Sequence, residues 1–149
     1  MALKELRKIT LFSDGASRGN PGQAGAGAVL VGDGMVIGEV AKYLGKMTNN
    51  EAEYEAVLLG LSTLKKMVGK KNLRKLSIEV KMDSELVARQ LAGVYQLKEK
   101  TLFPYFVAIW NLQVKDFPKI IFTHIPREKN KEADRLANEA IDSSQRGLL

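Results

Sequence analysis

Apolar residues recur along this chain with two different periods, which predict strands in some segments and helices in others. Short apolar or alternating runs bounded by turn residues predict five β-strands, at residues 8–14, 26–31, 35–46, 76–82 and 119–125. Apolar residues at helical spacing predict four α-helices, at residues 48–68, 84–91, 101–114 and 131–141. The fold class that follows is α/β.

The order of these elements predicts how the strands pair. The first three strands follow one another closely, with Gly32-Asp33-Gly34 as a hairpin turn, and are expected to form an antiparallel meander. Later strands are separated by helices, and a strand–helix–strand order requires a parallel crossover. The glycine-rich stretch DGASRGNPGQAGAG after the first strand is expected to be a loop. It either lets backbone N–H groups approach a phosphate or is a tight turn without a ligand.

The helix at 48–68 begins with residues that suit an N-cap and with acidic residues that suit the helix dipole. Its core-facing stripe consists of Val57, Gly60, Leu61, Leu64 and Val68. Glu53 lies one turn earlier on that stripe, and a carboxylate facing a core is unfavourable unless something neutralises it. Glu53 is therefore a candidate metal ligand. In a frayed first turn it would only favour the dipole.

The two C-terminal helices also show one apolar face each. The face of the helix at 101–114 comprises Leu102, Phe106, Ile109, Trp110 and Gln113, and Trp110 is expected in the core. The inward face of the last helix comprises Ala133, Leu136, Ala137 and Ala140, with Asp134 beside it. Residues 142–149 are expected to form a loose tail.

Four carboxylates stand at the ends of these elements. Asp14 ends the first strand and Asp83 ends the fourth, whereas Glu53 opens the main helix and Asp134 lies in the last. If the two strands are parallel neighbours, both aspartates lie at one sheet edge, within reach of the two helices. Four anions this close require cations. Alternatively, Asp83 is only the N-cap of the following helix, and the acids are scattered on the surface.

Composition narrows the chemistry. The chain has 149 residues, no cysteine and one histidine, so a metal site would be built mainly from oxygen ligands, which suit magnesium, manganese or calcium. The net charge of +6 reflects either a lysine-rich surface or attraction to a polyanion such as nucleic acid. No apolar run is long enough to span a bilayer and no signal-peptide core is evident, so a cytoplasmic location is expected.

Motifs in four places carry a family resemblance: DGASRGNPG, TNNEAEYEA, DSELV and IPREKNKEADRLANEA. In this order and spacing the chain resembles type 1 ribonuclease H over about residues 8–141. The resemblance implies one ribonuclease H domain spanning 1–149, with a five-stranded mixed sheet in the order 3-2-1-4-5 and helices on both faces. It also implies endonucleolytic cleavage of the RNA strand of RNA–DNA hybrids, leaving 5′-phosphate and 3′-hydroxyl ends.

The resemblance assigns roles to residues of this chain. The catalytic, metal-binding acids would be Asp14, Glu53, Asp83 and Asp134. They would hold two Mg²⁺ ions, with Mn²⁺ as a substitute, which activate water and stabilise the leaving oxygen. The residues implied to bind the hybrid, without reading its sequence, are Gly15, Ser17, Asn20, Lys46, Thr48, Asn49 and Asn50.

The chain departs from some family members in two ways. The stretch from Ala92 to Pro104 is too short for the basic helical projection, and no N-terminal hybrid-binding domain is evident, so hybrid binding is expected to be strongly salt-sensitive rather than tight. A monomer without an obligate protein partner is expected. Before the last helix, some members use a histidine and others an arginine to assist catalysis. This chain offers both His124 and Arg127, of which Arg127 is slightly favoured for reaching the substrate phosphate, whereas His124 is as well explained as a packed strand residue.

Overall fold

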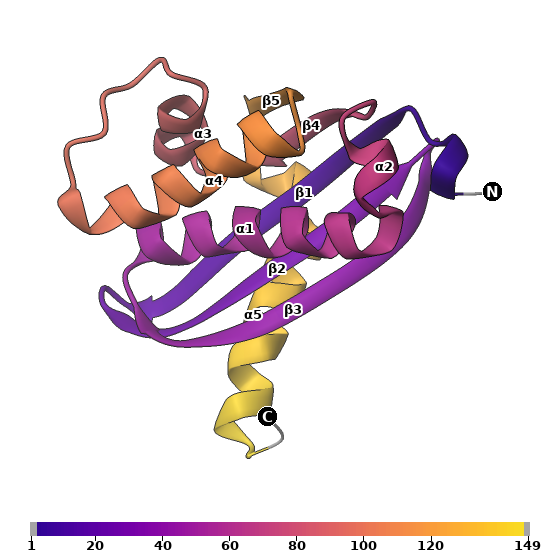
Figure 1. Ribbon diagram of the computed structural model, residues 1–149. Coiled ribbons are helices and arrows are strands. Elements are labelled where there is room, and N and C mark those ends of the chain that lie inside the picture. The colour runs from indigo at the N-terminus through magenta and orange to yellow at the C-terminus, as the bar shows by residue number, and fades with distance from the viewer. Residues whose placement is uncertain (1–2, 148–149) are drawn as a thin grey trace.

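The computed structural model describes residues 3–147, which form one five-stranded sheet with helices on both faces (Figure 1). The strands are β1 (Lys8–Gly19), β2 (Gly22–Gly32), β3 (Met35–Met47), β4 (Ser77–Met82) and β5 (Lys119–His124). The α-helices are α1 (Asn49–Val68), α2 (Lys70–Leu73), α3 (Glu85–Leu91), α4 (Phe103–Lys115) and α5 (Lys131–Gln145). Short 3-10 turns lie at Leu3–Glu5, Lys100–Leu102 and Arg127–Lys129.

The strand order is β3-β2-β1-β4-β5, which confirms the order implied by the family resemblance. The first three strands pair antiparallel, and β4 pairs parallel with both β1 and β5. Helices α1, α3 and α4 lie on one face of the sheet, and α5 crosses the other face (Figure 1). Because β1 and β4 are adjacent and parallel, the C-terminal end of β4 lies beside the middle of β1, close to Phe12.

The main core lies between the sheet and α1. Alternate residues of the strands, such as Ile9, Leu11 and Val80, are fully buried against the helix. The predicted stripe of α1 is confirmed by burial of Val57, Gly60, Leu61 and Leu64, while Val68 is half-buried. Thr48 caps this helix by accepting a hydrogen bond from the Glu51 N–H, and the Glu51 side chain accepts one from the Thr48 N–H in return.

The prediction of a loop at DGASRGNPGQAGAG was wrong. Strand β1 continues to Gly19 and β2 begins at Gly22, so only Asn20 and Pro21 form the turn between them. Glycines in these strands allow the backbone of α5 to pack directly on β2. A Cβ at Gly27 would lie 2.3 Å from the carbonyl oxygen of Ala133. Here glycine marks the close approach of a helix rather than an irregular loop.

Two further predictions need correction. Trp110 is 53% exposed on α4 rather than buried, while Leu102 and Ile109 of the predicted face are buried. The tail predicted from residue 142 is helical to Gln145, and the Asp142 carboxylate pairs with the Arg18 guanidinium at 2.6 Å. Residues 148 and 149 of that tail lie outside the described residues. Within residues 3–147, no helix combines the length and apolar character needed to cross a membrane.

Candidate active site

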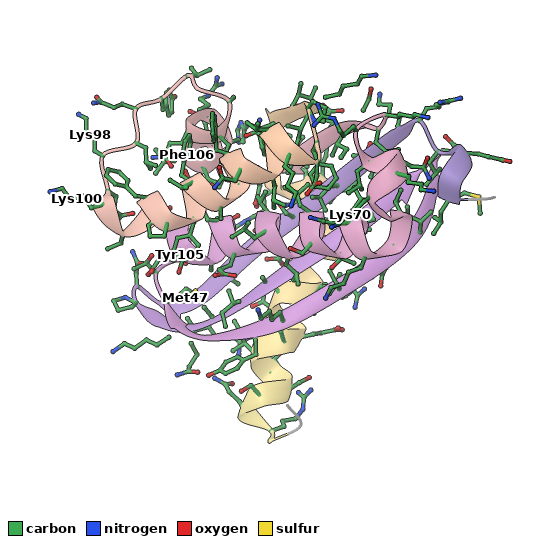
Figure 2. All side chains as sticks on the ribbon, viewed as in Figure 1. Met47, Lys70, Lys98, Lys100, Tyr105 and Phe106 are labelled. Atoms are coloured by element: carbon green, nitrogen blue, oxygen red, sulfur yellow. The ribbon has the colours of Figure 1, made fainter. Side chains whose placement is uncertain are left out.

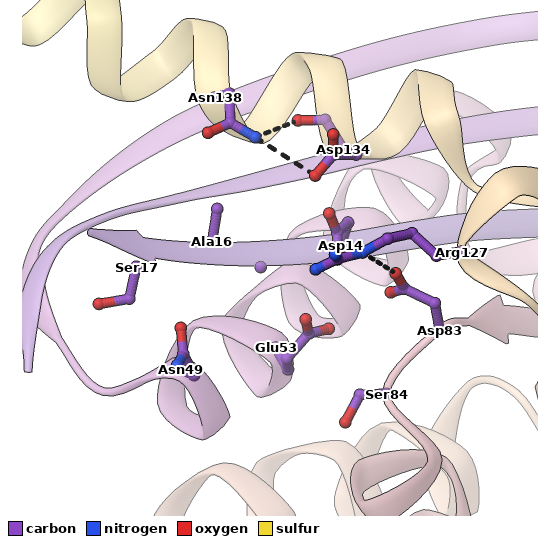
Figure 3. Close-up of a pocket in the computed structure, with 11 residues that line it drawn as sticks. Asp14, Ala16, Ser17, Asn49, Glu53, Asp83, Ser84, Arg127, Asp134 and Asn138 are labelled. Atoms are coloured by element: carbon purple, nitrogen blue, oxygen red, sulfur yellow. Dashed lines mark hydrogen bonds and ion pairs between the residues drawn. The ribbon is translucent and has the colours of Figure 1, made fainter. Parts of the chain in front are cut away.

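Three carboxylates from distant parts of the chain converge beside the middle of β1, where the parallel strand β4 ends (Figure 3). The prediction that Asp14 ends its strand was wrong, because β1 continues to Gly19. Asp14 and Asp83 each stand two residues beyond Phe12 and Lys81, which are register partners in the parallel β1–β4 pair. Glu53 comes from the first turns of α1. One carboxylate oxygen from each of the three residues lies within 4.8 Å of the others. Parallel register therefore produces the juxtaposition of the two aspartates that the sequence predicted.

The alternative interpretations of Glu53 and Asp83 are wrong. Glu53 is 9% exposed and lies within α1 rather than in a frayed turn. The N-cap of α3 is Ser84, whose hydroxyl accepts a hydrogen bond from the Val87 N–H, so Asp83 does not serve as the cap. Both carboxylates therefore occupy positions that local helix structure does not explain.

Gly15 brings α1 against β1 at this point. A Cβ on Gly15 would lie 2.2 Å from the backbone carbon of Ala52 and 2.3 Å from the backbone nitrogen of Glu53. Real side-chain atoms do not approach a backbone so closely, so only glycine fits here. The contact holds the first turns of α1 beside the middle of β1, and Glu53 consequently reaches Asp14.

Asp134 of α5 lines the same pocket and contributes to the raised pKa of Asp14. Its carboxylate accepts a hydrogen bond from the Asn138 amide nitrogen one turn later, at 3.3 Å. The Arg18 guanidinium in turn donates to the Asn138 side-chain oxygen at 3.3 Å. All four predicted acids thus face one pocket, although Asp134 stands apart from the three that meet most closely (Figure 3).

Burial and mutual repulsion change the protonation of this cluster. Burial, together with the negative charges of Glu53 and Asp83, raises the pKa of Asp14 to about 11. Burial likewise raises the pKa of Glu53 to about 8, and the negative charge of Asp83 raises it further. Hydrogen bonds from Asp14 and from the Gly15 N–H lower this pKa and so partly offset the shift. Without a cation, the pair consequently retains protons at neutral pH.

The residues present fit a divalent metal ion. The Glu53 Oε2 atom is buried and has no hydrogen-bond partner, so one carboxylate oxygen of the cluster is available as a ligand. The acids supply only oxygen donors, which Mg²⁺ and Mn²⁺ prefer. A cation among them would replace the protons that the carboxylates otherwise retain.

Asn130 is a site residue that the sequence analysis missed. It is 2% exposed, and its side-chain nitrogen donates to the Ser13 carbonyl oxygen at 2.9 Å and to Asp83 Oδ1 at 3.4 Å. Its own carbonyl oxygen accepts from the Asp134 N–H at 3.2 Å. Asn130 therefore links the segments that carry three of the acids. The available signal in the sequence was that Asn130 directly precedes a segment with helical spacing of apolar residues. That position predicts a helix N-cap and does not predict the hydrogen bonds that join these segments.

Replacing Asn130 with alanine is expected to lower the free energy of unfolding by about 1–3 kcal/mol, because two buried acceptors lose a donor. Urea denaturation of the metal-free protein measures this change. The matched control is Asn138→Ala, which removes half-buried contacts and is expected to shift stability by less than about 1 kcal/mol. Equal losses in the two variants would contradict the linking role of Asn130.

The other predicted site residues fall into two groups. Gly15, Ser17, Asn49 and Arg127 line the acidic pocket, and the Arg127 Nε atom lies 3.7 Å from Asp83 Oδ2. Ser84, Ala16 and Asn138 also line it and were not predicted. His124 is not a lining residue, and its Nδ1 atom instead lies 3.7 Å from Glu85 Oε2. The geometry thus favours Arg127 over His124.

The remaining predicted hybrid-binding residues lie outside the pocket lining, next to it in sequence. The Asn20 side-chain oxygen accepts from the Asn49 N–H at 3.0 Å and so ties the β1–β2 turn to the start of α1. Lys46 is exposed, Thr48 is the helix cap, and Asn50 is half-buried.

Comparison with known proteins identifies the family. Residues 12–140 match the family model described as reverse transcriptase-like. The chain is 38% identical over 138 residues to ribonuclease HI of Halobacterium salinarum, covering 92% of this chain and 66% of that protein. It is 37% identical over 139 residues to a bifunctional protein of Mycobacterium tuberculosis, covering 92% of this chain but only 36% of that protein. The chain therefore spans about two thirds or less of these relatives.

A solved structure matches almost from end to end. It is LC11-RNase H1, an enzyme isolated from compost, in complex with an RNA/DNA hybrid. The TM-score is 0.88 and the sequence identity 46%, with 92% of this chain and 99% of that chain covered. Fold, motif order and the convergence of the acids agree with this match, and the chain belongs to the type 1 ribonuclease H family.

Proposed function

We propose that this protein hydrolyses the RNA strand of RNA–DNA hybrids endonucleolytically, leaving 5′-phosphate and 3′-hydroxyl ends. The observation that carries the proposal is the meeting of Asp14, Glu53 and Asp83 within 4.8 Å, with Asp134 in the same pocket. A protein that only binds nucleic acid gains nothing from anions facing a phosphate. The hybrid specificity is inferred from the family and from LC11-RNase H1, which was solved with such a hybrid.

The four acids would hold a pair of divalent ions, with Mg²⁺ expected and Mn²⁺ as a substitute. When bound, such ions lower the pKa of water and stabilise the charge on the leaving 3′-oxygen. The protein itself contributes preorganisation. Gly15 fixes the distance between α1 and β1, and Asn130 holds Asp83 beside Ser13 of β1, so the metal-binding carboxylates need little rearrangement.

The rim of the pocket would position the hybrid without reading its sequence. Ser17 and Asn49 stand at the rim and offer hydrogen-bonding groups to a minor groove, while Glu53 would face the 2′-hydroxyl side of the RNA. Lys46 and Thr48 would hold a phosphate of the DNA strand. The Thr48 hydroxyl accepts a hydrogen bond as a helix cap but retains its proton for donation to a phosphate.

The direct test is cleavage of end-labelled duplexes by the full chain. We expect the RNA strand of an RNA–DNA hybrid to be cut with Mg²⁺ and to stay intact with chelator, and duplex DNA and duplex RNA to remain uncut. The products are expected to accept a 3′-extension by a polymerase, because they end in 3′-hydroxyl groups. Cleavage of duplex RNA at an equal rate would contradict the proposed substrate.

Arg127 is expected to assist the reaction and His124 is not. Arg127→Ala should lower kcat by roughly 10-fold or more, because its guanidinium lies at the pocket and is 87% exposed toward approaching substrate. His124→Ala should leave kcat within about threefold, since a surface substitution away from the pocket has small effects. Steady-state kinetics on the hybrid measure kcat of both variants. A large loss in the His124 variant, or none in either variant, would contradict this assignment.

A further inference from the structure

Helix α4 carries an exposed apolar stripe that the fold does not use. Phe103, Val107, Trp110 and Val114 are spaced by four, three and four residues, so they lie on one face of the helix. They are 42%, 52%, 53% and 56% exposed, respectively. The opposite face already packs on the protein, with Ile109 buried and the Tyr105 ring 6.4 Å from that of Tyr54 on α1.

The helix is therefore apolar on two faces but covered on one. No charged residue occurs between Thr101 and Val114. A helix that is apolar all round is expected to be covered all round, and exposed apolar patches of this kind often mark interaction sites. Spacing of four and three residues is that of a coiled-coil seam, so the shape that complements the stripe is another helix.

Net positive charge stands at both ends of the stripe. Lys98 and Lys100, with Glu99 between them in the sequence, lie beside the N-terminal end of α4 (Figure 2). At the C-terminal end, Lys115 follows Val114, and the Arg74 guanidinium donates to the carbonyl oxygens of Val114 and Lys115 at 2.9 and 2.7 Å. A complementary partner would carry acidic residues around its apolar seam.

A second copy of the chain fits this surface poorly. Two copies would bring basic ends and a net charge of +6 each into contact. A stable dimer also needs about 800 Å² from each partner, whereas even a large aromatic side chain buries only about 150–250 Å² when fully covered. Four side chains that are each about half-exposed provide less than a dimer requires.

We propose that α4 docks an amphipathic helix of a partner protein, with apolar residues at the same spacing and acidic residues flanking them. The residues that line the acidic pocket come from β1, α1, α5 and the segments around Asp83 and Arg127, and none comes from α4. Docking on α4 therefore leaves the pocket free. The inference does not depend on the proposed hydrolytic function.

Trp110 is the only tryptophan of the chain and reports directly on this surface. The probe is a synthetic helical peptide with leucines at four-three-four spacing and glutamates at the other positions. Its addition is expected to shift the Trp110 emission to shorter wavelength, because the indole leaves water. The same peptide with lysines in place of the glutamates is expected to cause no shift, and high salt should weaken binding of the acidic peptide.

Val107→Ser keeps the reporter and should weaken peptide binding at least about tenfold. The matched control is Val36→Ser on β3, where the valine is 59% exposed but distant in sequence from α4, and it should bind as the wild type does. Both variants are expected to retain the thermal unfolding temperature and hybrid cleavage. Retained cleavage with lost peptide binding separates this surface from the acidic pocket.

Three outcomes would overturn the proposal. The first is no emission shift with the acidic peptide, or equal affinity of the Val107 variant and the wild type. The second is a shift caused by anionic phosphatidylglycerol vesicles but not by the peptide, which would assign the stripe to a lipid surface. The third is a dimer in sedimentation equilibrium that Val107→Ser dissociates, which would assign the stripe to a second copy.

Discussion

Replacing Asp14 with asparagine is expected to abolish cleavage of the RNA strand and to make the metal-free protein more stable. Activity should fall by roughly 10³-fold or more, equivalent to about 4 kcal/mol of transition-state stabilisation. Asp14 interacts with every other acid of the cluster, since Glu53, Asp83 and Asp134 all raise its pKa. Removing the negative charge of Asp14 should therefore weaken the binding of divalent ions in the pocket.

The gain in stability follows from the same burial. The Asp14 side chain is 5% exposed and its pKa is strongly raised, so the folded state must take up a proton at neutral pH. Asparagine occupies the same space without that requirement, and a gain of about 0.5–2 kcal/mol at pH 8 is expected, as for other functional residues that oppose stability. The gain should vanish near pH 4, where the aspartate is protonated in the unfolded chain as well.

Urea denaturation with chelator at pH 4 and pH 8, paired with single-turnover cleavage, measures both effects. The matched control is Asp33→Asn in the exposed β2–β3 turn, where φ is 51° and asparagine is well tolerated. This control should change neither activity nor stability appreciably. A destabilised Asp14 variant with full activity would contradict both the electrostatic argument and the catalytic assignment.

The stability of the metal-free wild type is expected to fall as pH rises from about 4. In the folded state the pKa values of Asp14 and Glu53 are raised to about 11 and about 8, whereas in the unfolded chain both groups lose their protons near pH 4. Between these limits the folded state binds more protons, so the free energy of unfolding decreases with pH. The loss continues through pH 8 for Glu53 and toward pH 11 for Asp14.

Mg²⁺ should counter this loss, and more strongly at higher pH, because it binds the deprotonated carboxylates. At a concentration 100 times its Kd, a ligand adds about 2.7 kcal/mol, and each kcal/mol raises Tm by roughly 2–4 °C in a chain of this size. Thermal unfolding at pH 5 and pH 8, with Mg²⁺ or chelator, tests this. Glu53→Gln should flatten the pH dependence, and an Mg²⁺ effect independent of pH would contradict the explanation.

The sequence could predict the site as far as it depended on strand ends and helix periodicity. Parallel pairing of the two strands predicts that Asp14 and Asp83 lie side by side. In the structure, each aspartate lies two residues beyond a member of the same register pair. Glu53 was identified because it lies on the buried stripe of α1. These inferences need only the spacing of apolar residues and the order of the predicted strands and helices, both of which can be read from the sequence.

What could not be predicted depended on contacts between distant segments. Gly25 was predicted to lie in a loop because glycine is usually a turn residue, whereas it makes room for the backbone of α5 at Ala137. Asn130 resembled a helix cap, yet its side chain bonds to Ser13 and Asp83 instead. Trp110 was assigned to the core because it is apolar, but helical spacing alone cannot distinguish which of two apolar faces packs inward.

The close contact at Gly15 limits how the distance between α1 and β1 can change, both on heating and through mutation. Because main chain meets main chain there, the distance between the backbones of α1 and β1 is set by direct van der Waals contact rather than by intervening side chains. Rotamer exchange of packing side chains therefore cannot widen the gap between these two elements, which should keep its width until the sheet itself melts. For the same reason the spacing cannot be tuned in small steps, since the smallest addition at this position already displaces a whole helix.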